Sequence, residues 1–127
     1  MTGLGAISAL AVAGALALSG PTAKVTLAAA GHAPKIGTHW VYTVRATENG
    51  KPAAARVTAQ IVDPLGGVHA VEFGKSSKNV ANWPFKGSFR DFVVWPSSSI
   101  GVPLGFRVTV LVGKTKRVIT YKVTAAK

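Results

Sequence analysis

Apolar and polar residues alternate with a period of two along most of the chain after residue 39. Trp40, Tyr42 and Val44 fall on one face of such a stretch, and polar or charged residues occupy much of the other. This spacing is typical of half-buried β-strands, because successive side chains point to opposite faces of a sheet. The alternation predicts strands over residues 40–45, 55–61, 68–73, 89–95, 104–110 and 117–124.

Turn-forming residues separate these stretches. Asn49-Gly50 follows the first, and both residues tolerate the positive φ that a tight hairpin requires. Segments rich in Gly, Pro and Ser follow at 64–67 and 96–103, and Gly113-Lys114-Thr115 predicts a further turn. Reversals at intervals of about 8–12 residues, with no helical period between them, favour an antiparallel β-sandwich or barrel.

The alternation also predicts which side chains face the core. Strand 89–95 is the least clear, because Phe89, Val93 and Trp95 share a face with Asp91. We expect this face to point inward, so that Asp91 needs a partner at the edge of the core. The other predicted inward residues are Trp40, Tyr42, Val44, Val57, Ile61, Phe106, Val108, Ile119, Tyr121 and Val123. The predicted outward basic residues are Arg45, Arg56, Arg107, Lys116, Arg117 and Lys122.

Two parts of the chain resemble the immunoglobulin-like domains of exported bacterial proteins. The first runs through Pro34-Lys35-Ile36-Gly37, Trp40-Val41-Tyr42-Thr43-Val44 and Asn49-Gly50-Lys51-Pro52, and looks like the opening of such a domain. The second, Gly87-Ser88-Phe89-Arg90-Asp91 through Trp95-Pro96 and then Gly101 to Arg107, looks like the closing hairpin. The resemblance covers about residues 33–124 and implies an all-β, antiparallel immunoglobulin-like sandwich of about seven strands. It implies no ligand or catalytic residue, and the cysteine pair of antibody domains is missing.

The first 23 residues contain no charged side chain, and Leu4 to Leu18 is an apolar run broken only by Ser8. About 15 apolar residues fit the core of a helical signal peptide better than the ~20 needed to span a bilayer. Ala28-Ala29-Ala30 offers a cleavage site, so we expect a signal peptide at 1–30 and a single domain at 31–127. An uncleaved anchor and a folded segment are the alternatives, since no basic residue precedes Leu4.

The chain is strongly basic, with 15 Lys and Arg against 4 Asp and Glu. Removal of residues 1–30 would leave 14 basic and 4 acidic residues, a net charge of +10. This charge favours contact with polyanions, although a merely lysine-rich soluble surface is the alternative. The absence of cysteine excludes disulfides, thiolate metal sites and cysteine nucleophiles.

Candidates for catalysis are few. Glu72 and Asp91 are conceivable as an acid pair of a glycosidase, and Ser97-Ser98-Ser99 as a nucleophile assisted by His69 and Asp91. No nucleophile elbow or other catalytic context surrounds these residues. We therefore expect no enzyme, and a small secreted hydrolase stays the least favoured alternative.

Metal and cofactor binding have little support. The three histidines match no common ligand spacing. Cleavage after Ala29 would place His32 third from a free amine, in an arrangement suited to Cu(II); otherwise His32 would belong to a loose, solvent-exposed tail. We expect no metal site and no cofactor.

One short stretch combines aromatic and basic side chains. Trp83, Phe85, Lys86 and Arg90 are the candidate residues for binding a polyanion or a carbohydrate. The alternative is that Trp83-Pro84-Phe85 is a loop that packs over the end of the sandwich.

These observations predict a secreted or cell-surface, non-enzymatic module with a structural or adhesive role at the cell envelope. Its expected partners are anionic envelope polymers or another surface protein. We expect no nucleic acid as a partner, and a membrane only through the N-terminal segment if that segment is not cleaved. The alternative function is binding of an envelope polyanion or carbohydrate through the basic and aromatic surface.

Overall fold

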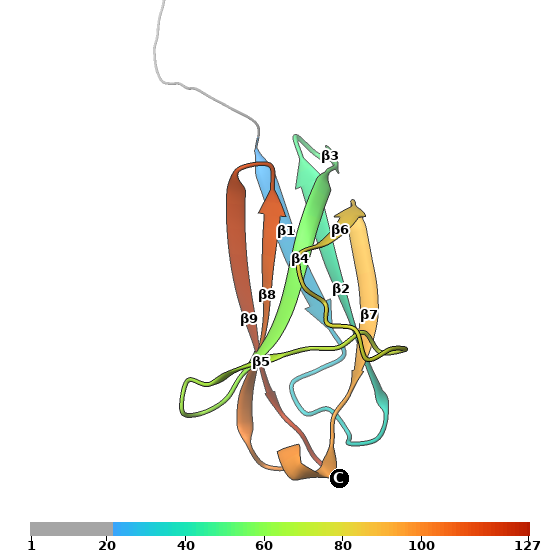
Figure 1. Cartoon of the computed structure of the whole chain (residues 1–127), viewed down its shortest axis with the longest axis vertical. Helices are drawn as coiled ribbons and strands as arrows, with labels where there is room; N and C mark the ends of the chain where they lie inside the picture. Colours follow the sequence, from blue (N-terminus) through green and yellow to red (C-terminus); the bar gives the residue numbers. More distant parts are fainter. Residues whose placement is uncertain (1–21) are drawn as a thin grey trace, which may run out of the picture.

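The computed structural model describes residues 22–127 as two antiparallel β-sheets packed as a sandwich (Figure 1). The apolar run Leu4–Leu18, and with it the predicted signal helix, lies outside the described residues. Strand β1 starts at one end of the sandwich, and the C-terminus lies at the opposite end (Figure 1). The two-layer, all-β architecture expected from the alternation is confirmed.

The first sheet, called the β1–β2–β7 sheet, has four strands. They are β1 (Ala23–Ala29), β2 (His39–Glu48), the two-residue β3 (Lys51–Pro52) and β7 (Ser88–Val94). The long strand β2 lies at its centre and pairs with the other three. Asn49 and Gly50, both with positive φ, turn the chain from β2 into β3, as Asn-Gly predicts.

The second sheet, called the β4–β8–β9 sheet, has five strands. They are β4 (Ala54–Val62), β5 (Val68–Ala70), β6 (Trp83–Lys86), β8 (Pro103–Val112) and β9 (Thr115–Thr124). Strand β4 pairs with β8 on one side and with β5 and β6 on the other, and β8 pairs with β9. A single 3-10 turn (Ser97–Ser99) connects the two sheets after β7.

The core between the sheets is built from aromatic residues and valines. Trp40 of β2 lies edge-on to Phe106 of β8, with ring centroids 5.1 Å apart, and to Trp95 at 5.4 Å. All the residues predicted to face inward are buried or packed against this core. The inward facing of β7 is also confirmed, because Phe89 and Trp95 are buried. Asp91 finds its partner at the edge of the core, where both carboxylate oxygens lie 3.2 Å from the backbone N–H of Gly74.

Three local expectations are corrected. Trp83–Lys86 is not an end loop but the strand β6, antiparallel to the first half of β4. The strand expected over 68–73 ends at Ala70, and the chain then folds over the edge of β7. Arg117 pairs with the inward-facing Val110, so it lies on the inner side of β9, although its side chain is exposed.

Strand β1 lies upstream of the domain boundary expected after residue 30. Its seven residues pair with Tyr42–Glu48 of β2, and Val25 and Leu27 pack against the core. The small and apolar residues that we assigned to the end of a leader therefore form the inner face of an edge strand, with Lys24 and Thr26 on the outer face. Cleavage of a leader stays a prediction.

We expect a chain that begins at Thr22 to be more stable than one that begins at Gly31. Loss of β1 exposes the edge of β2 and removes the partly buried Val25 and Leu27, a cost of at least about 2 kcal/mol. Urea unfolding of the two chains measures the difference. Equal midpoints would show that β1 contributes nothing to the sandwich.

The phenol of Tyr42 is fully buried, and its hydroxyl has no hydrogen-bond partner among residues 22–127. Burial raises the pKa of Tyr42 far above its ordinary value, and the nearby Asp91 raises it further. The ring lies 4.6 Å from Phe106, so its apolar part fits the core. Only the hydroxyl is unfavourable there, because it is a polar group buried among apolar side chains.

Replacement of Tyr42 by Phe is expected to raise the free energy of unfolding by about 1 kcal/mol. The change keeps the ring and removes a buried polar atom whose desolvation costs about 1–3 kcal/mol when it is unpaired. Chemical denaturation measures the change. A loss of stability in the Phe variant would mean that the hydroxyl has a partner in solution.

Candidate functional site on the outer face of the β4–β8–β9 sheet

The outer face of the β4–β8–β9 sheet collects basic side chains from four strands. Residues directly opposite in an antiparallel pair lie on the same face of the sheet. Arg56 pairs with Leu111, which pairs with Lys116, and Arg107 lies between Gln60 and Thr120. Gly105 lies between Val62 and Lys122. With Lys86 of β6, the basic residues of this surface, here called the basic face, are Arg56, Lys86, Arg107, Lys116 and Lys122.

The chain's four carboxylates do little to neutralise this charge. Glu48 ends β2 in the other sheet. Asp91 accepts a hydrogen bond from the backbone N–H of Gly74, and Glu72 lies after β5, where it forms a β-bridge with Asn79. Only Asp63 lies at the end of the basic face, directly after β4. Among residues 22–127, Asp63 and His69 form the only close contact between an acidic and a basic side chain. The five cations of the basic face therefore have no carboxylate partner there.

Two arginines of the basic face are held by hydrogen bonds. Nη2 of Arg107 donates to Oε1 of Gln60, 2.8 Å away on the neighbouring strand. Nη1 of Arg56 donates to the carbonyl oxygen of Asn82 at 3.1 Å. Each bond uses one N–H of a guanidinium group that carries five. The other N–H groups of each guanidinium are thus partly oriented even without a bound anion.

A hollow of about 480 Å³ opens on the basic face around Gly105. Arg107, Thr120, Lys122 and Thr124 line it together with Asp63, and Val62 and Pro103 add apolar surface. Leu104 and Val123 also border it, but their side chains face the core. Gly105 itself has no side chain to fill the space. A Cβ there would lie 3.0 Å from Cγ2 of Thr120, so a larger residue would displace its neighbour.

Asp63 organises the turn at the end of this hollow. Its carboxylate accepts hydrogen bonds from His69 Nε2 at 2.8 Å and from the backbone N–H groups of Gly67 and Leu65 at 2.8 and 2.9 Å. The His69 bond, followed by that of Gly67, lowers the pKa of the Asp63 carboxyl below its ordinary value of 3.8. The stabilisation from these bonds is complete above about pH 4 and is lost as the pH falls through the lowered pKa.

Replacement of Asp63 by Asn is expected to reduce stability at pH 6 and to have a smaller effect at pH 3. The wild-type carboxylate accepts all three bonds at pH 6 but loses charge as it becomes protonated in acid. Urea unfolding at the two pH values gives the comparison. His69→Ala serves as the control, because it leaves both backbone bonds of the turn in place. If Asp63→Asn lowered the free energy of unfolding equally at both pH values, the result would contradict a stabilising role of the ionised Asp63 carboxylate in the turn.

The four residues predicted to bind a polyanion or carbohydrate do not share one face. Trp83 and Phe85 pair with the inward-facing Val57 and Ala55, so both rings lie at the open edge of the sandwich. Trp83 is 38% exposed and lies edge-on to Phe73, with ring centroids 5.0 Å apart. Lys86 belongs to the basic face.

Arg90 pairs with Thr43 on the outer face of the other sheet, away from Lys86. The structure therefore brings together Trp83 and Phe85, places Lys86 beside them on the outside, and separates Arg90 from all three. Their binding role stays a prediction. The alternation identified Arg56, Arg107, Lys116 and Lys122 as outward, but nothing local in the sequence pairs Gln60 with Arg107.

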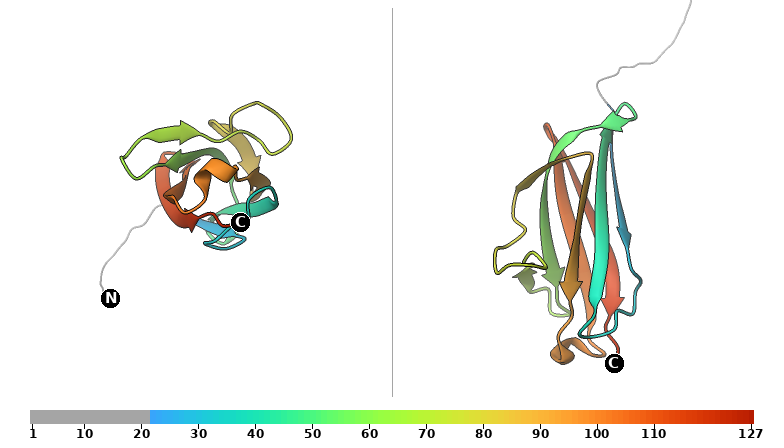
Figure 2. Two further views of the ribbon diagram at one scale, coloured as in Figure 1. Left: turned by 90° about the horizontal axis from the view of Figure 1, so that it is seen from below. Right: turned by 90° about the vertical axis from the view of Figure 1, so that its right-hand side faces the viewer.

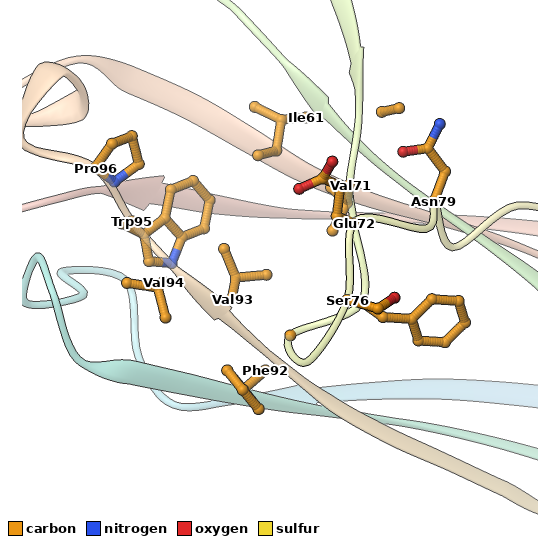
Figure 3. A pocket seen from close by; sticks show the side chains of 13 residues that line it. Ile61, Val71, Glu72, Ser76, Asn79, Phe92, Val93, Val94, Trp95 and Pro96 are labelled. Carbon is orange, nitrogen blue, oxygen red and sulfur yellow. The ribbon is translucent and has the colours of Figure 1, made fainter.

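A larger cavity, of about 660 Å³, lies between the chain after β5 and the end of β7. In Figure 3, Trp95, Val93 and Pro96 lie on one side of it, and Glu72 and Asn79 approach from the other. Its walls combine apolar side chains with polar groups, and its only charged lining residue is Glu72. Glu72 would repel an anion, so this cavity does not suit the polymers that the charge of the chain favours.

The predicted catalytic alternatives are not joined by hydrogen bonds. His69 bonds to Asp63 rather than to a serine, and Oγ of the buried Ser99 donates to the carbonyl oxygen of Pro96 at 2.6 Å. Asp91 bonds to Gly74. Within residues 22–127, no group of three or more His, Asp or Glu side chains is placed to hold a metal ion.

His32 is part of the packed connection between β1 and β2 rather than a loose tail. Its ring stacks on Tyr121 with centroids 4.1 Å apart, and Nδ1 donates to the carbonyl oxygen of Lys122 at 2.6 Å. Copper ligation by this histidine would have to release that bond.

Comparison with known proteins adds no family: no protein-family model matches the chain, and no curated protein matches it. The helices described within residues 22–127 include none long and apolar enough to cross a membrane. The geometry of the basic face is therefore the main basis for a function.

Proposed function

We propose that the chain is an exported, non-enzymatic immunoglobulin-like module that adheres to anionic polymers of the cell envelope through its basic face. The observation that carries the proposal is the set of five unpaired cations on one rigid sheet surface. A sheet surface of one sign attracts extended polymers of the opposite sign and needs no deep cleft.

The order of the strands supports the immunoglobulin-like part of the proposal. In an immunoglobulin sandwich the second strand pairs with the first and the fifth, while the third pairs with the sixth and the sixth with the seventh. If β1, β2, β4, β7, β8 and β9 are taken as strands A, B, C, E, F and G, all four pairings are present. Strand β5 pairs with β4, in the position of an extra strand beside C.

Export rests on the uncharged N-terminal run. Such a run is typical of a secretory leader. Outside the cytoplasm, a domain without disulfides depends on its core, and two interlocked tryptophans with Tyr42 and Phe106 supply one. The envelope also provides the polyanions that would meet the basic face.

Retention on a heparin column, used as a sulfated polysaccharide probe, tests the adhesive function. We expect the wild type to bind at low salt and to elute as the NaCl concentration rises. The reason is that the Debye length, over which charges interact, falls from about 10 Å at 0.1 M to about 3 Å at 1 M salt. Combined R56Q, R107Q and K122Q substitutions are expected to lower the eluting salt concentration to roughly half.

The matched control removes three charges from the other sheet, by K24Q, R45Q and R90Q. An equal shift in both triple variants would mean that net charge alone governs retention and would overturn the assignment to the basic face. No retention of the wild type at low salt would leave the module without this adhesive role. Loss of retention in Trp83→Ala alone would favour the aromatic edge as the binding surface.

A further inference from the structure

We propose that the hollow around Gly105 is a binding site for one acidic sugar unit, with its carboxylate or phosphate group held by Arg107 and Lys122. The inference rests on the proposed function, because it names the part of the basic face that recognises a chemical unit rather than charge alone. The site lies on three neighbouring strands of one sheet, β4, β8 and β9 (Figures 1 and 2).

The floor of the site exists because residue 105 lacks a side chain. Gly105 lies between Val62 and Lys122 in the register, where any other residue would project outward between its neighbours. The volume of about 480 Å³ falls in the range of roughly 300–1,000 Å³ usual for small-molecule sites. The apolar surfaces of Val62 and Pro103 on the rim can pack against the C–H face of a sugar ring.

The cationic side of the site is partly organised in advance. Gln60 holds Arg107 through the 2.8 Å bond to Nη2, and this leaves the other guanidinium donors for an oxyanion. Arg binds planar and tetrahedral oxyanions through two parallel hydrogen bonds, and Lys122 adds a second charge. Gln60 is thus a positioning residue, because it acts on the ligand only through Arg107.

The other polar residues that line the hollow suit hydroxyl groups rather than a second anion. The carboxylate of Asp63 lines it and can accept a bond from a sugar hydroxyl, and the side chains of Thr120 and Thr124 can donate or accept. A site that combines two cations, one carboxylate and two hydroxyls matches an acidic sugar better than an isolated phosphate ion. A run of sulfates or phosphates would meet the charge of Asp63 unfavourably at this point.

Titration of the isotope-labelled full chain with a short galacturonate oligomer tests the site, with glucose 6-phosphate and neutral maltotriose as comparison ligands. We expect both acidic sugars to shift the amide resonances of Gly105, Thr120 and Lys122, and maltotriose to leave them unmoved. The stronger of the two acidic probes identifies carboxylate or phosphate as the preferred group.

Two variants keep the net charge and alter the site. Gly105→Val fills the hollow and is expected to weaken binding by about tenfold or more, once circular dichroism shows that it folds. Gln60→Met releases Arg107 without removing it and is expected to weaken binding several-fold, since charge-assisted bonds lose strength when their donor is not held. Gln60→Met also keeps the test decisive if Gly105→Val does not fold.

Heparin retention separates the two proposals. If Gly105→Val keeps wild-type retention and loses the galacturonate shifts, both the basic face and the hollow are supported. If galacturonate and glucose 6-phosphate bind neither the wild type nor the variants while retention persists, the hollow is overturned and the adhesive function stands. Wild-type binding that survives unchanged in both variants would also overturn the hollow. Binding of maltotriose as tight as that of galacturonate would overturn the acidic class of ligand.

Discussion

The contact of Trp40 with Phe106 and Trp95 holds the two sheets of this domain together. Trp40 is 2% exposed, and its ring meets Phe106 from the opposite sheet and Trp95 from the end of β7 at edge-to-face geometry. Its indole N–H donates to the carbonyl oxygen of Gly31 at 2.8 Å, so the polar atom of the ring is satisfied. The chain has no cysteine, so this aromatic contact joins the sheets without a disulfide.

The same core determines the surface. Because side chains alternate between faces, burial of Ala59, Val57 and Val108 forces Arg56, Gln60 and Arg107 outward. A slip of one residue in the pairing of β4 with β8 would turn the side chains of one strand to the other face. It would bury either Arg56 or Arg107 and expose the valines of that strand, at a cost that no nearby carboxylate offsets. The basic face is therefore as firmly specified as the core, although none of its members packs there.

Local patterns in the sequence were sufficient for most strands and for their facing. The alternation around Tyr42, Val57, Phe106 and Val123 identified the inner faces, and Asn49-Gly50 identified the hairpin. Strand β1 was missed because the alternation of Val25 and Leu27 with Lys24 and Thr26 lies directly before Ala28-Ala29-Ala30, which resembles the end of a leader. Strand β6 was missed because Pro84 is unusual inside a strand; it is accommodated there since β6 lies at the margin of the sheet.

The arrangement of the candidate site was beyond such patterns, because it depends on pairings between distant segments. Gln60 and Arg107 are 47 residues apart in the chain and meet only when β4 pairs with β8. Lys122 reaches the hollow through the separate pairing of β8 with β9. The grouping of Trp83, Phe85, Lys86 and Arg90 relied instead on closeness in sequence, which strands on two sheets do not preserve.

A binding surface on paired strands differs physically from one made of loops. The backbone of β4, β8 and β9 is fixed by ladder hydrogen bonds, so little backbone entropy is lost when a ligand settles on it. The side chains still have to be ordered. The hydrogen bonds that Arg107 donates to Gln60 and Arg56 donates to Asn82 order two of them already during folding. Lys116 and Lys122 have no such anchor and stay adaptable. The combination of two oriented guanidinium groups with adaptable ammonium groups agrees with the proposed ligand, in which one defined anionic unit is part of a longer, less regular polyanion.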